Sequence, residues 1–267
     1  MWLDEDAPIR KRDLFLEKPF LNAPGTLGFA PDPHTMPFLQ ELGAFVTHPI
    51  SRSPRQPANT RTCLPFPGGF LLHTGWPNPG IRRAIARYQR AWAAADLPVI
   101  VHLLGESPGM TAEMVRMLEG LENILAVEVG LPLGCSPSAL VAYLDAASGE
   151  LPVVISLPPD DMPLLLKTLV EQQPAAVHLQ PPRGTLPDGT GRSVSGRLYG
   201  PATFPLALQV LQRWSDSSLR LIAGGGVFTQ EEAQALLDSG AFAVGLDVVL
   251  WQIGTQKMFN HSPGNDF

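Results

Sequence analysis

The alternation of short apolar segments with helical patterns is the feature that most constrains the fold of this chain. From Leu97 onward the alternation recurs at a spacing of roughly 20 to 30 residues, which is typical of repeated parallel βα units. Each apolar segment is nearly uninterrupted, as expected for strands that are covered on both faces. The predicted strands are Val99–Leu103, Leu125–Val129, Val153–Leu157, Ala176–Gln180, Leu219–Ala223 and Phe242–Leu246, and upstream Gly25–Phe29 and Ala44–Thr47.

Eight such units, without a dinucleotide-binding glycine motif, favour a closed barrel over a doubly wound open sheet. We therefore predict an α/β fold, a single (β/α)₈ TIM barrel domain over residues 1–267. A further helix is expected directly after Gly245. The other clearly marked helices are a short one at His34–Leu42, an amphipathic one at Ile81–Ala95, and one that begins after Thr229 and ends near Gly240.

Two long segments, His48–Pro79 and Pro181–Pro201, interrupt the alternation. Both follow predicted strands and are expected to be loops at the carboxyl end of the barrel, where barrel enzymes build their active sites. Loops of this length usually serve binding. We expect the first to cover the barrel mouth. The alternative is a contact between two copies of the chain in a homodimer, because Phe66, Phe70 and Trp76 would form an apolar patch if they faced outward.

Charge and cysteine content exclude several classes of partner. The net charge of −6 and the pI near 5.5 give no general attraction for nucleic acid. No apolar run approaches the roughly 18 residues needed to span a bilayer. Cys63 and Cys135 have no metal-ligand spacing and are typical of a reduced protein. We expect a cytoplasmic protein that acts on a small molecule, without a membrane partner or a metal.

Glycines follow the last two predicted strands. Gly224, Gly225 and Gly226 come after the seventh strand, and Gly245 ends the eighth. Glycine lets backbone N–H groups approach an anion, and this corner of a barrel often binds a phosphate group. Asp247 stands directly beyond. It is expected either to cap the last helix or, if its carboxylate occupies the space of the phosphate oxygens, to leave that corner without room for phosphate.

Several motifs, in the same order along the chain, resemble those of the dihydroorotate dehydrogenases, especially the soluble class-1 enzymes. Residues 23–29, Ala-Pro-Gly-Thr-Leu-Gly-Phe, resemble that family's Ala-Ser-Gly-Thr-Phe-Gly-Phe. Residues 75–80, Gly-Trp-Pro-Asn-Pro-Gly, resemble its Gly-Leu-Gln-Asn-Pro-Gly, and residues 198–202, Leu-Tyr-Gly-Pro-Ala, resemble its Leu-Ser-Gly-Pro-Ala. The resemblance implies a TIM barrel that binds FMN and serves pyrimidine biosynthesis as an oxidoreductase.

The resemblance also implies a set of site residues. The FMN phosphate would lie against Gly225, Gly226 and Gly245, with the flavin ring above the first strand near Ala23 and Gly25. Soluble members place a catalytic base near Cys135, although their residue aligns more closely with Leu133, so the alternative for Cys135 is an inert thiol. The remaining candidates are His48, Ser156 and Gly200 for the cofactor, and Asn78 and Gln180 for the substrate.

The side chains that carry the family's chemistry are largely replaced. Its two lysines beside the flavin correspond to His48 and Ser156, and its asparagine-rich fourth-strand motif corresponds to residues 130–135, Gly-Leu-Pro-Leu-Gly-Cys. Burying the polar groups of dihydroorotate without partners costs about 1–3 kcal/mol each. We therefore expect slow oxidation of dihydroorotate or none. The candidates for a replacement carboxylate anchor are Arg55, Arg61 and Arg183.

Three functions remain open on the sequence alone. The first is an FMN-dependent oxidoreductase of the dihydroorotate dehydrogenase type with an altered substrate. The second is a redox-inactive barrel that acts as a binding or structural subunit, and the third is a non-flavin barrel enzyme that binds a phosphorylated metabolite. The chain also carries ionisable residues near the expected carboxyl ends of its strands, for acid–base chemistry or as ordinary satisfied side chains: His48, His73, His102, His178 and Glu128.

Overall fold

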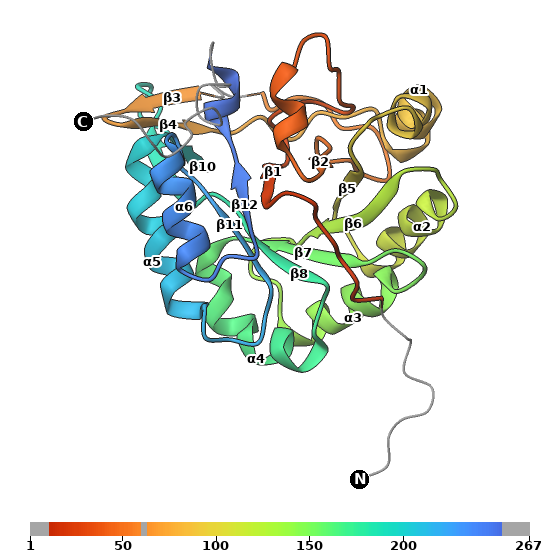
Figure 1. The fold of residues 1–267 in the computed structure, drawn as a ribbon. Coiled ribbons are helices and arrows are strands. Elements are labelled where there is room, and N and C mark those ends of the chain that lie inside the picture. Colours follow the sequence, from red (N-terminus) through yellow and green to blue (C-terminus); the bar gives the residue numbers. More distant parts are fainter. Residues whose placement is uncertain (1–10, 60–62, 253–267) are drawn as a thin grey trace, which may run out of the picture.

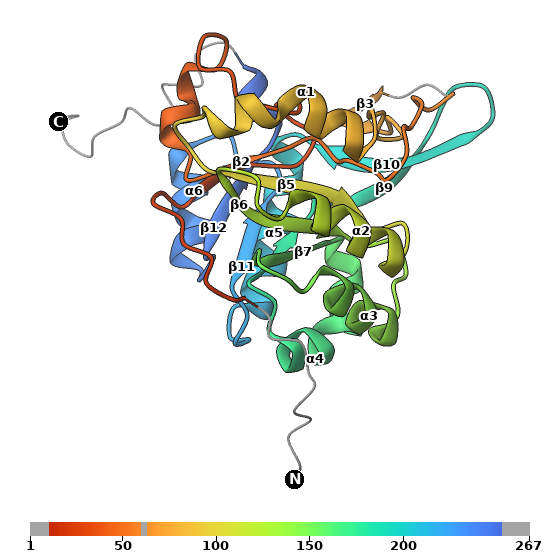
Figure 2. The same ribbon diagram turned by 90° about the vertical axis from the view of Figure 1, so that its right-hand side faces the viewer.

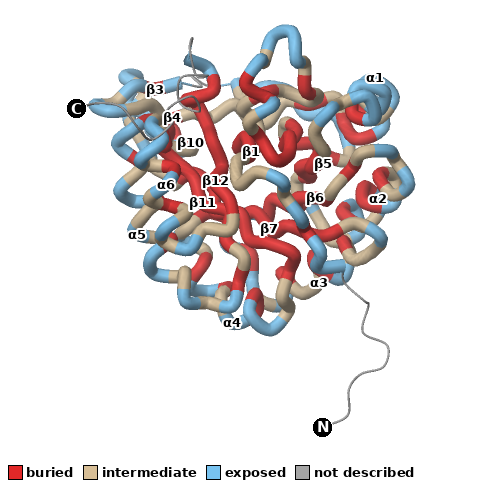
Figure 3. Tube along the Cα trace, in the orientation of Figure 1, coloured by how far each residue is buried: buried red, intermediate tan, exposed pale blue. Residues whose placement is uncertain are grey.

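The computed structural model describes residues 11–59 and 63–252, and it confirms the predicted (β/α)₈ barrel (Figure 1). Eight parallel strands follow one another in the order β1-β12-β11-β8-β7-β6-β5-β2. A parallel bridge between Leu21 and Ala44 joins the two end strands, β1 and β2, and closes the barrel. Helices surround the strands, and the buried part of the chain is the ring of strands inside them (Figure 3).

The barrel strands are β1 (Phe20–Asn22), β2 (Phe45–Val46), β5 (Val99–Leu104), β6 (Ile124–Gly130), β7 (Val153–Leu157), β8 (Ala176–Leu179), β11 (Leu221–Gly224) and β12 (Ala243–Leu246). The α-helices are α1 (Ile81–Ala93), α2 (Pro108–Leu118), α3 (Pro137–Ala147), α4 (Met162–Gln172), α5 (Phe204–Trp214) and α6 (Gln230–Asp238). Short 3₁₀ helices are η1 (Pro37–Glu41), η2 (Pro159–Asp161), η3 (Pro201–Thr203) and η4 (Val248–Trp251). Thr229 is the N-cap of α6, as expected, and forms a full capping box with Glu232.

The first strand lies upstream of its predicted position. Residues 25–29 form turns instead, because Gly25 and Gly28 have φ angles of 90° and 84° and the Thr26 hydroxyl bonds back to the Ala23 carbonyl. The strand is Phe20–Asn22, which pairs with β12. The elements expected as helices before the second strand and after Gly245 are the 3₁₀ helices η1 and η4 rather than α-helices.

The two long segments, which were expected to be loops, each contain two strands. The first contributes β3 (Cys63–Phe66) and β4 (Gly69–Leu72), and the second contributes β9 (Arg183–Pro187) and β10 (Ser193–Tyr199). These four pair as an antiparallel sheet in the order β3-β4-β10-β9. Figure 2 shows β9 and β10 extending beyond the barrel strands. The sheet forms because two segments distant in sequence, each a hairpin, meet at β4 and β10.

The prediction that residues 1–267 form one domain stays a prediction. Residues 1–10, 60–62 and 253–267 lie outside the described residues, and they include Arg61, one of the predicted carboxylate anchors. No helix in the described part is long and apolar enough to cross a membrane. Among the same residues no group of three or more histidine, cysteine, aspartate or glutamate side chains has the arrangement of a metal site.

The side chain of Asn22 completes the barrel where its backbone ladder is weakest. Its Nδ2 donates to the Val46 carbonyl and its Oδ1 accepts from the Val46 N–H, each at 2.7 Å. Both groups are buried, and β1 and β2 otherwise share a single backbone bridge. One amide thus satisfies the backbone groups that a longer ladder would pair.

We predict that Asn22→Ala lowers the free energy of unfolding by about 2–4 kcal/mol, because it leaves two buried backbone groups unpaired. Urea denaturation followed by circular dichroism measures this. The control is Thr35→Ala, which removes an exposed hydroxyl bonded to Asp32 and should change stability little. Equal stabilities of the two variants would contradict this role of Asn22.

Candidate active site

The side chains inside the barrel change from apolar to ionisable toward its mouth. Residues two apart along a strand share a face of the sheet. On β5, β6 and β8 a buried apolar residue of the barrel interior is followed two positions later by an ionisable one. These pairs are Ile100 and His102, Ala126 and Glu128, and Ala176 and His178. The alternation places three ionisable groups in one layer.

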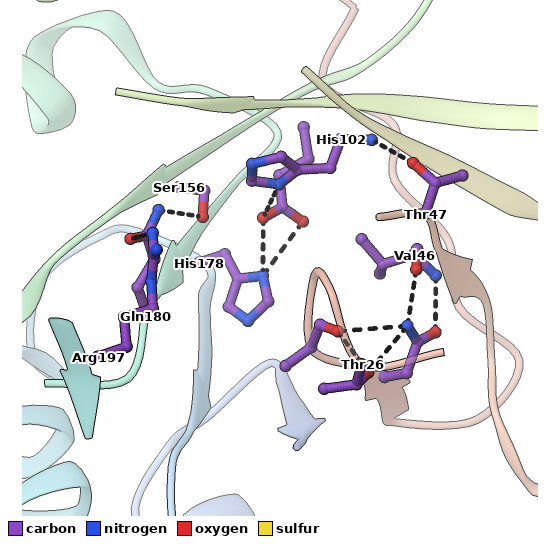
Figure 4. Close-up of polar contacts among 11 residues, drawn as sticks. Thr26, Val46, Thr47, His102, Ser156, His178, Gln180 and Arg197 are labelled. Atoms are coloured by element: carbon purple, nitrogen blue, oxygen red, sulfur yellow. Dashed lines mark hydrogen bonds and ion pairs between the residues drawn. The ribbon is translucent and has the colours of Figure 1, made fainter. Parts of the chain in front are cut away.

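Glu128 bonds to both histidines of this layer. His102 lies beside it in the β5–β6 register, and its Nδ1 is 3.0 Å from Glu128 Oε1. The Nδ1 of His178 is 3.1 Å from each carboxylate oxygen (Figure 4). Burial opposes ionisation of Glu128, but the charges and hydrogen bonds of the two histidines outweigh it and hold the pKa of this carboxyl below its ordinary value. The carboxylate is therefore ionised although it is buried.

An open cavity of about 410 Å³ lies at the barrel mouth, within the size range of small-molecule sites. Residues of the barrel and of the antiparallel sheet line it together. The polar and charged ones are Arg55, His73, Thr74, His102, Glu106, Gln180, Arg183, Arg197 and Tyr199. Arg55 is already paired with Glu106 at 3.2 Å. The remaining charge of the lining is carried by arginines, so the cavity favours an anion.

Arg183 and Arg197 lie directly opposite each other on β9 and β10, and both line the cavity. Arg197 donates to Gln180 Oε1, and its guanidinium lies 4.6 Å from the centre of the Trp76 ring. Gln180 in turn donates to the Ser156 hydroxyl at 3.0 Å (Figure 4). Burial lowers the pKa of Arg197 from its ordinary value, and Arg183 acts in the same direction. Like charges paired across strands destabilise a sheet.

The glycine-rich corner after β11 and β12 is occupied by a side chain of the protein itself. The Asp247 carboxylate accepts from the N–H of Gly226 at 3.3 Å and of Val248 at 2.6 Å. It is 1% exposed. Burial raises the pKa of Asp247 to about 6, although the backbone N–H groups act in the opposite direction. One of these donors, the Gly226 N–H, belongs to the glycines that the sequence assigned to a phosphate group.

Trp76 covers the space above the first strand. A Cβ on Gly25 would lie 2.4 Å from the Trp76 ring, so the indole packs directly onto that glycine. His48 lies between the rings of Phe29 and Trp76, with ring centres 5.0 and 5.5 Å away. Burial, and then His102, lower the pKa of His48 to about 4, so it is neutral at pH 7.

Most other predicted site residues lie in the structural framework. Asn78 accepts from the N–H of Ser51 and Gly80 and donates to the Trp76 carbonyl, so it holds the loop rather than facing the cavity. The Ala23 N–H donates to the Leu246 carbonyl. A Cβ on Gly200 would lie 2.5 Å from the Gly68 carbonyl oxygen, which places this glycine against the β3–β4 turn. Of the predicted substrate residues, the structure brings Gln180 to the cavity.

Cys135 lies away from the cavity lining, while Leu133 belongs to it. The Cys135 thiol is buried and lies 3.6 Å from the Ser136 carbonyl oxygen. Burial, and then Asp161, raise its pKa, so the thiolate is disfavoured. Its role as a base stays a prediction, and its surroundings are those of an inert thiol.

Sequence reasoning missed two features of this site. Arg197 was not among the candidate anchors, because the pairing of β9 with β10 that places it beside Arg183 was not predicted. The contact of His102 and His178 with one carboxylate was also missed. The two-residue alternation on the predicted strands would have placed these side chains and Glu128 on the same interior face.

Comparison with known proteins shows which proteins this chain resembles in sequence. No family model matches the chain. The catalytic subunit of dihydroorotate dehydrogenase B (NAD(+)) from Pelobacter propionicus is 27% identical over 283 residues, which cover 98% of this chain and 90% of the relative. The subunit of the same name from Maridesulfovibrio salexigens is 29% identical, over 94% of this chain and 87% of the relative.

Among solved structures, dihydroorotate dehydrogenase from Eimeria tenella in complex with ferulenol matches 89% of this chain and 77% of its own. The TM-score is 0.71 and the identity 12%, which shows a common fold. The predicted resemblance is thereby confirmed, and the chain is a diverged relative of the dihydroorotate dehydrogenases.

We predict that Asp247→Asn changes the pH dependence of stability. The pKa of Asp247 is raised from 3.8 to about 6, so the wild type progressively loses stability relative to the variant as pH rises from about 4 to about 6. Across that window the difference should change by about 3 kcal/mol, and above it the difference should stay constant. Urea denaturation of both proteins from pH 4 to pH 8 measures it. A difference that does not vary with pH would contradict the buried ionisation.

Proposed function

We propose that this dihydroorotate dehydrogenase-like barrel binds a small carboxylate-bearing molecule at its mouth and does so without flavin. The observation that carries the proposal is the pair Arg183 and Arg197, opposite each other across a ladder and both lining the cavity. Two guanidinium groups in this position repel each other unless an anion lies between them. Arginine binds carboxylates through two parallel hydrogen bonds, which suits such a ligand.

The surroundings of Arg197 prepare it for this role. Its five N–H donors have one hydrogen-bond acceptor among residues 11–59 and 63–252, the side chain of Gln180. The Trp76 ring supports one face of the guanidinium. Gln180 is itself held by Ser156. Arg197 is therefore fixed in place before a ligand arrives, which lowers the entropy cost of binding.

FMN, the cofactor that the resemblance implies, does not fit the residues of its expected site. Its phosphate is expected against Gly225, Gly226 and Gly245, and the Asp247 carboxylate already accepts from the Gly226 N–H. With a pKa of about 6, Asp247 is mainly ionised at pH 7 and would repel a phosphate dianion. The same contacts weigh against a phosphorylated metabolite at this corner.

The expected place of the flavin ring is also filled. The Trp76 indole lies on Gly25, where the ring would stack. The residues that stand in place of the family's two lysines are a neutral His48 and a Ser156 whose hydroxyl accepts from Gln180. Neither supplies the positive charge that stabilises a reduced, anionic flavin. These contacts favour a barrel that binds its ligand without redox chemistry over an FMN-dependent oxidoreductase.

We predict that orotate binds the full chain and that uracil, which has the same ring without the carboxylate, binds at least about ten-fold more weakly. Isothermal titration calorimetry measures both. Arg197→Met should weaken orotate binding by about 10- to 100-fold, because it removes a charge-assisted contact worth roughly 1.5–3 kcal/mol. Arg183→Met should weaken it as well.

The matched control is Arg192→Met, which removes an exposed arginine of the same hairpin that does not line the cavity. It should bind orotate like the wild type. Equal binding by all three arginine variants, or by orotate and uracil, would overturn the proposed anion site. So would the failure of every small carboxylate tested to bind.

We predict that the purified protein has no flavin absorbance and oxidises dihydroorotate slowly or not at all. The double variant Trp76→Leu/Asp247→Ala removes the side chains that fill the expected ring and phosphate places. It should bind FMN about 100-fold or more tightly than the wild type, because a buried like charge near the phosphate costs several kcal/mol. Quenching of FMN fluorescence measures the affinities.

Trp251→Leu is the control for this gain, because Trp251 is a half-exposed tryptophan on η4 and should leave FMN binding unchanged. A wild-type protein that is purified with bound FMN would refute the loss of flavin. An unchanged FMN affinity in the double variant would show that other residues close the site.

A further inference from the structure

One ring of the buried layer reaches the cavity. His102 belongs to the cavity lining, whereas His178, bonded to the same carboxylate, does not. Gly130 follows Glu128 by two residues on β6 and lies beside His102. A Cβ at position 130 would be 2.7 Å from His102 Nε2. Gly130 also lines the cavity. Position 130 thus places no side chain against Nε2, in a ring that belongs to the cavity lining.

Hydrogen bonding fixes the tautomer of His102. An ionised carboxylate accepts hydrogen bonds and donates none, so the Nδ1 that faces Glu128 carries the hydrogen. In the neutral ring Nε2 is then an unprotonated acceptor. Figure 4 shows this second nitrogen of His102 directed away from the carboxylate, toward the side where Ser156, Gln180 and Arg197 lie. A histidine oriented in this way by a carboxylate is the usual arrangement of a general base.

We propose that His102 is a catalytic proton-transfer group, and that the cavity takes a small carboxylate with a C–H next to a carbonyl group. The inference rests on the proposed function, because Arg183 and Arg197 hold the ligand in the same cavity that His102 Nε2 reaches. It goes beyond that function because it assigns a reaction to the site.

The step is a proton transfer and needs no oxidant or reductant. Nε2 takes the proton from the carbon, the C–H bond breaks, and its electron pair stays on the ligand as an enolate. The imidazolium that forms is stabilised by the Glu128 carboxylate on its other nitrogen. The negative charge of the enolate is stabilised by the arginines of the cavity. Return of a proton from Nε2 to the carbon, on the same or another position, completes the cycle.

His178 offers a matched comparison within the protein. It is as buried as His102 and bonds to the same carboxylate, and its Nε2 likewise lies next to a glycine, Gly245 of β12, but His178 does not line the cavity. A structural role in neutralising Glu128 is common to both rings. A chemical role is specific to the ring that reaches the ligand.

The test has two stages, both on the full chain. Calorimetry first determines which of L-dihydroorotate, pyruvate and 2-oxoglutarate bind, with dihydrouracil as the neutral counterpart of dihydroorotate. NMR in D₂O then measures exchange of the acidic C–H of each compound that binds. We expect exchange above the buffer rate with at least one of them. His102→Gln should lower it by about 100-fold or more, the usual contribution of a general base, while the Kd stays within the wild-type range.

Two further variants separate chemistry from folding. Gly130→Ala keeps both His102 and Glu128 but places a methyl group against Nε2, and it should also abolish exchange. His178→Gln removes the equivalent structural bond and should keep most of the exchange rate. Thermal denaturation shows that each variant is folded.

The outcomes distinguish the two proposals. Failure of every carboxylate to bind overturns the proposed function. Carboxylates that bind without exchanging overturn the proton transfer alone. Exchange that persists in His102→Gln, or is lost equally in His178→Gln, also overturns the assignment to His102.

Discussion

The buried carboxylate of Glu128 has to be neutralised by hydrogen bonds from within the barrel, and this requirement organises the centre of the molecule. Glu128 lies on β6, and its partners lie on β5, which is adjacent to β6, and on β8, which is separated from β6 by β7. One carboxylate thus connects strands that do not pair with each other. Removing a partner from a buried ion pair typically costs about 3–5 kcal/mol. The orientation of both imidazole rings therefore follows from the need to satisfy one carboxylate.

The glycine-rich corner and the barrel mouth differ in whether their positive groups have an acidic partner within the protein. At the glycine-rich corner, the protein supplies its own anion, because Asp247 bonds to the N–H groups of Gly226 and Val248. At the mouth, Arg183 and Arg197 face each other on adjacent strands and both line the cavity. An internal carboxylate closes the first site to phosphate, and the unfavourable pairing of positive charges at the second favours an external carboxylate.

The sequence predicts the barrel well, because strands buried on both faces leave uninterrupted apolar runs such as Val153–Leu157. It fails at β1, where only Phe20–Asn22 is extended and the glycines that follow turn the chain. It also fails at the antiparallel sheet, whose edge strands β3 and β9 carry prolines and exposed residues. At the site, the alternation along β5, β6 and β8 was readable. The pairing of β9 with β10 and the place of His102 in the cavity lining beside Gly130 depend on tertiary contacts that no local pattern encodes.

The glycines that most resemble a flavin site are required by the fold itself. A Cβ on Gly224 would lie 2.1 Å from the Gly245 carbonyl oxygen, and one on Gly226 would lie 2.5 Å from the Phe204 backbone nitrogen. Such contacts with backbone exclude any larger residue whether or not a phosphate is bound. A chain that gave up its cofactor would therefore keep these glycines for as long as it kept the barrel. The glycine pattern reports descent and fold, and the side chain beside it, Asp247, carries the information about the ligand.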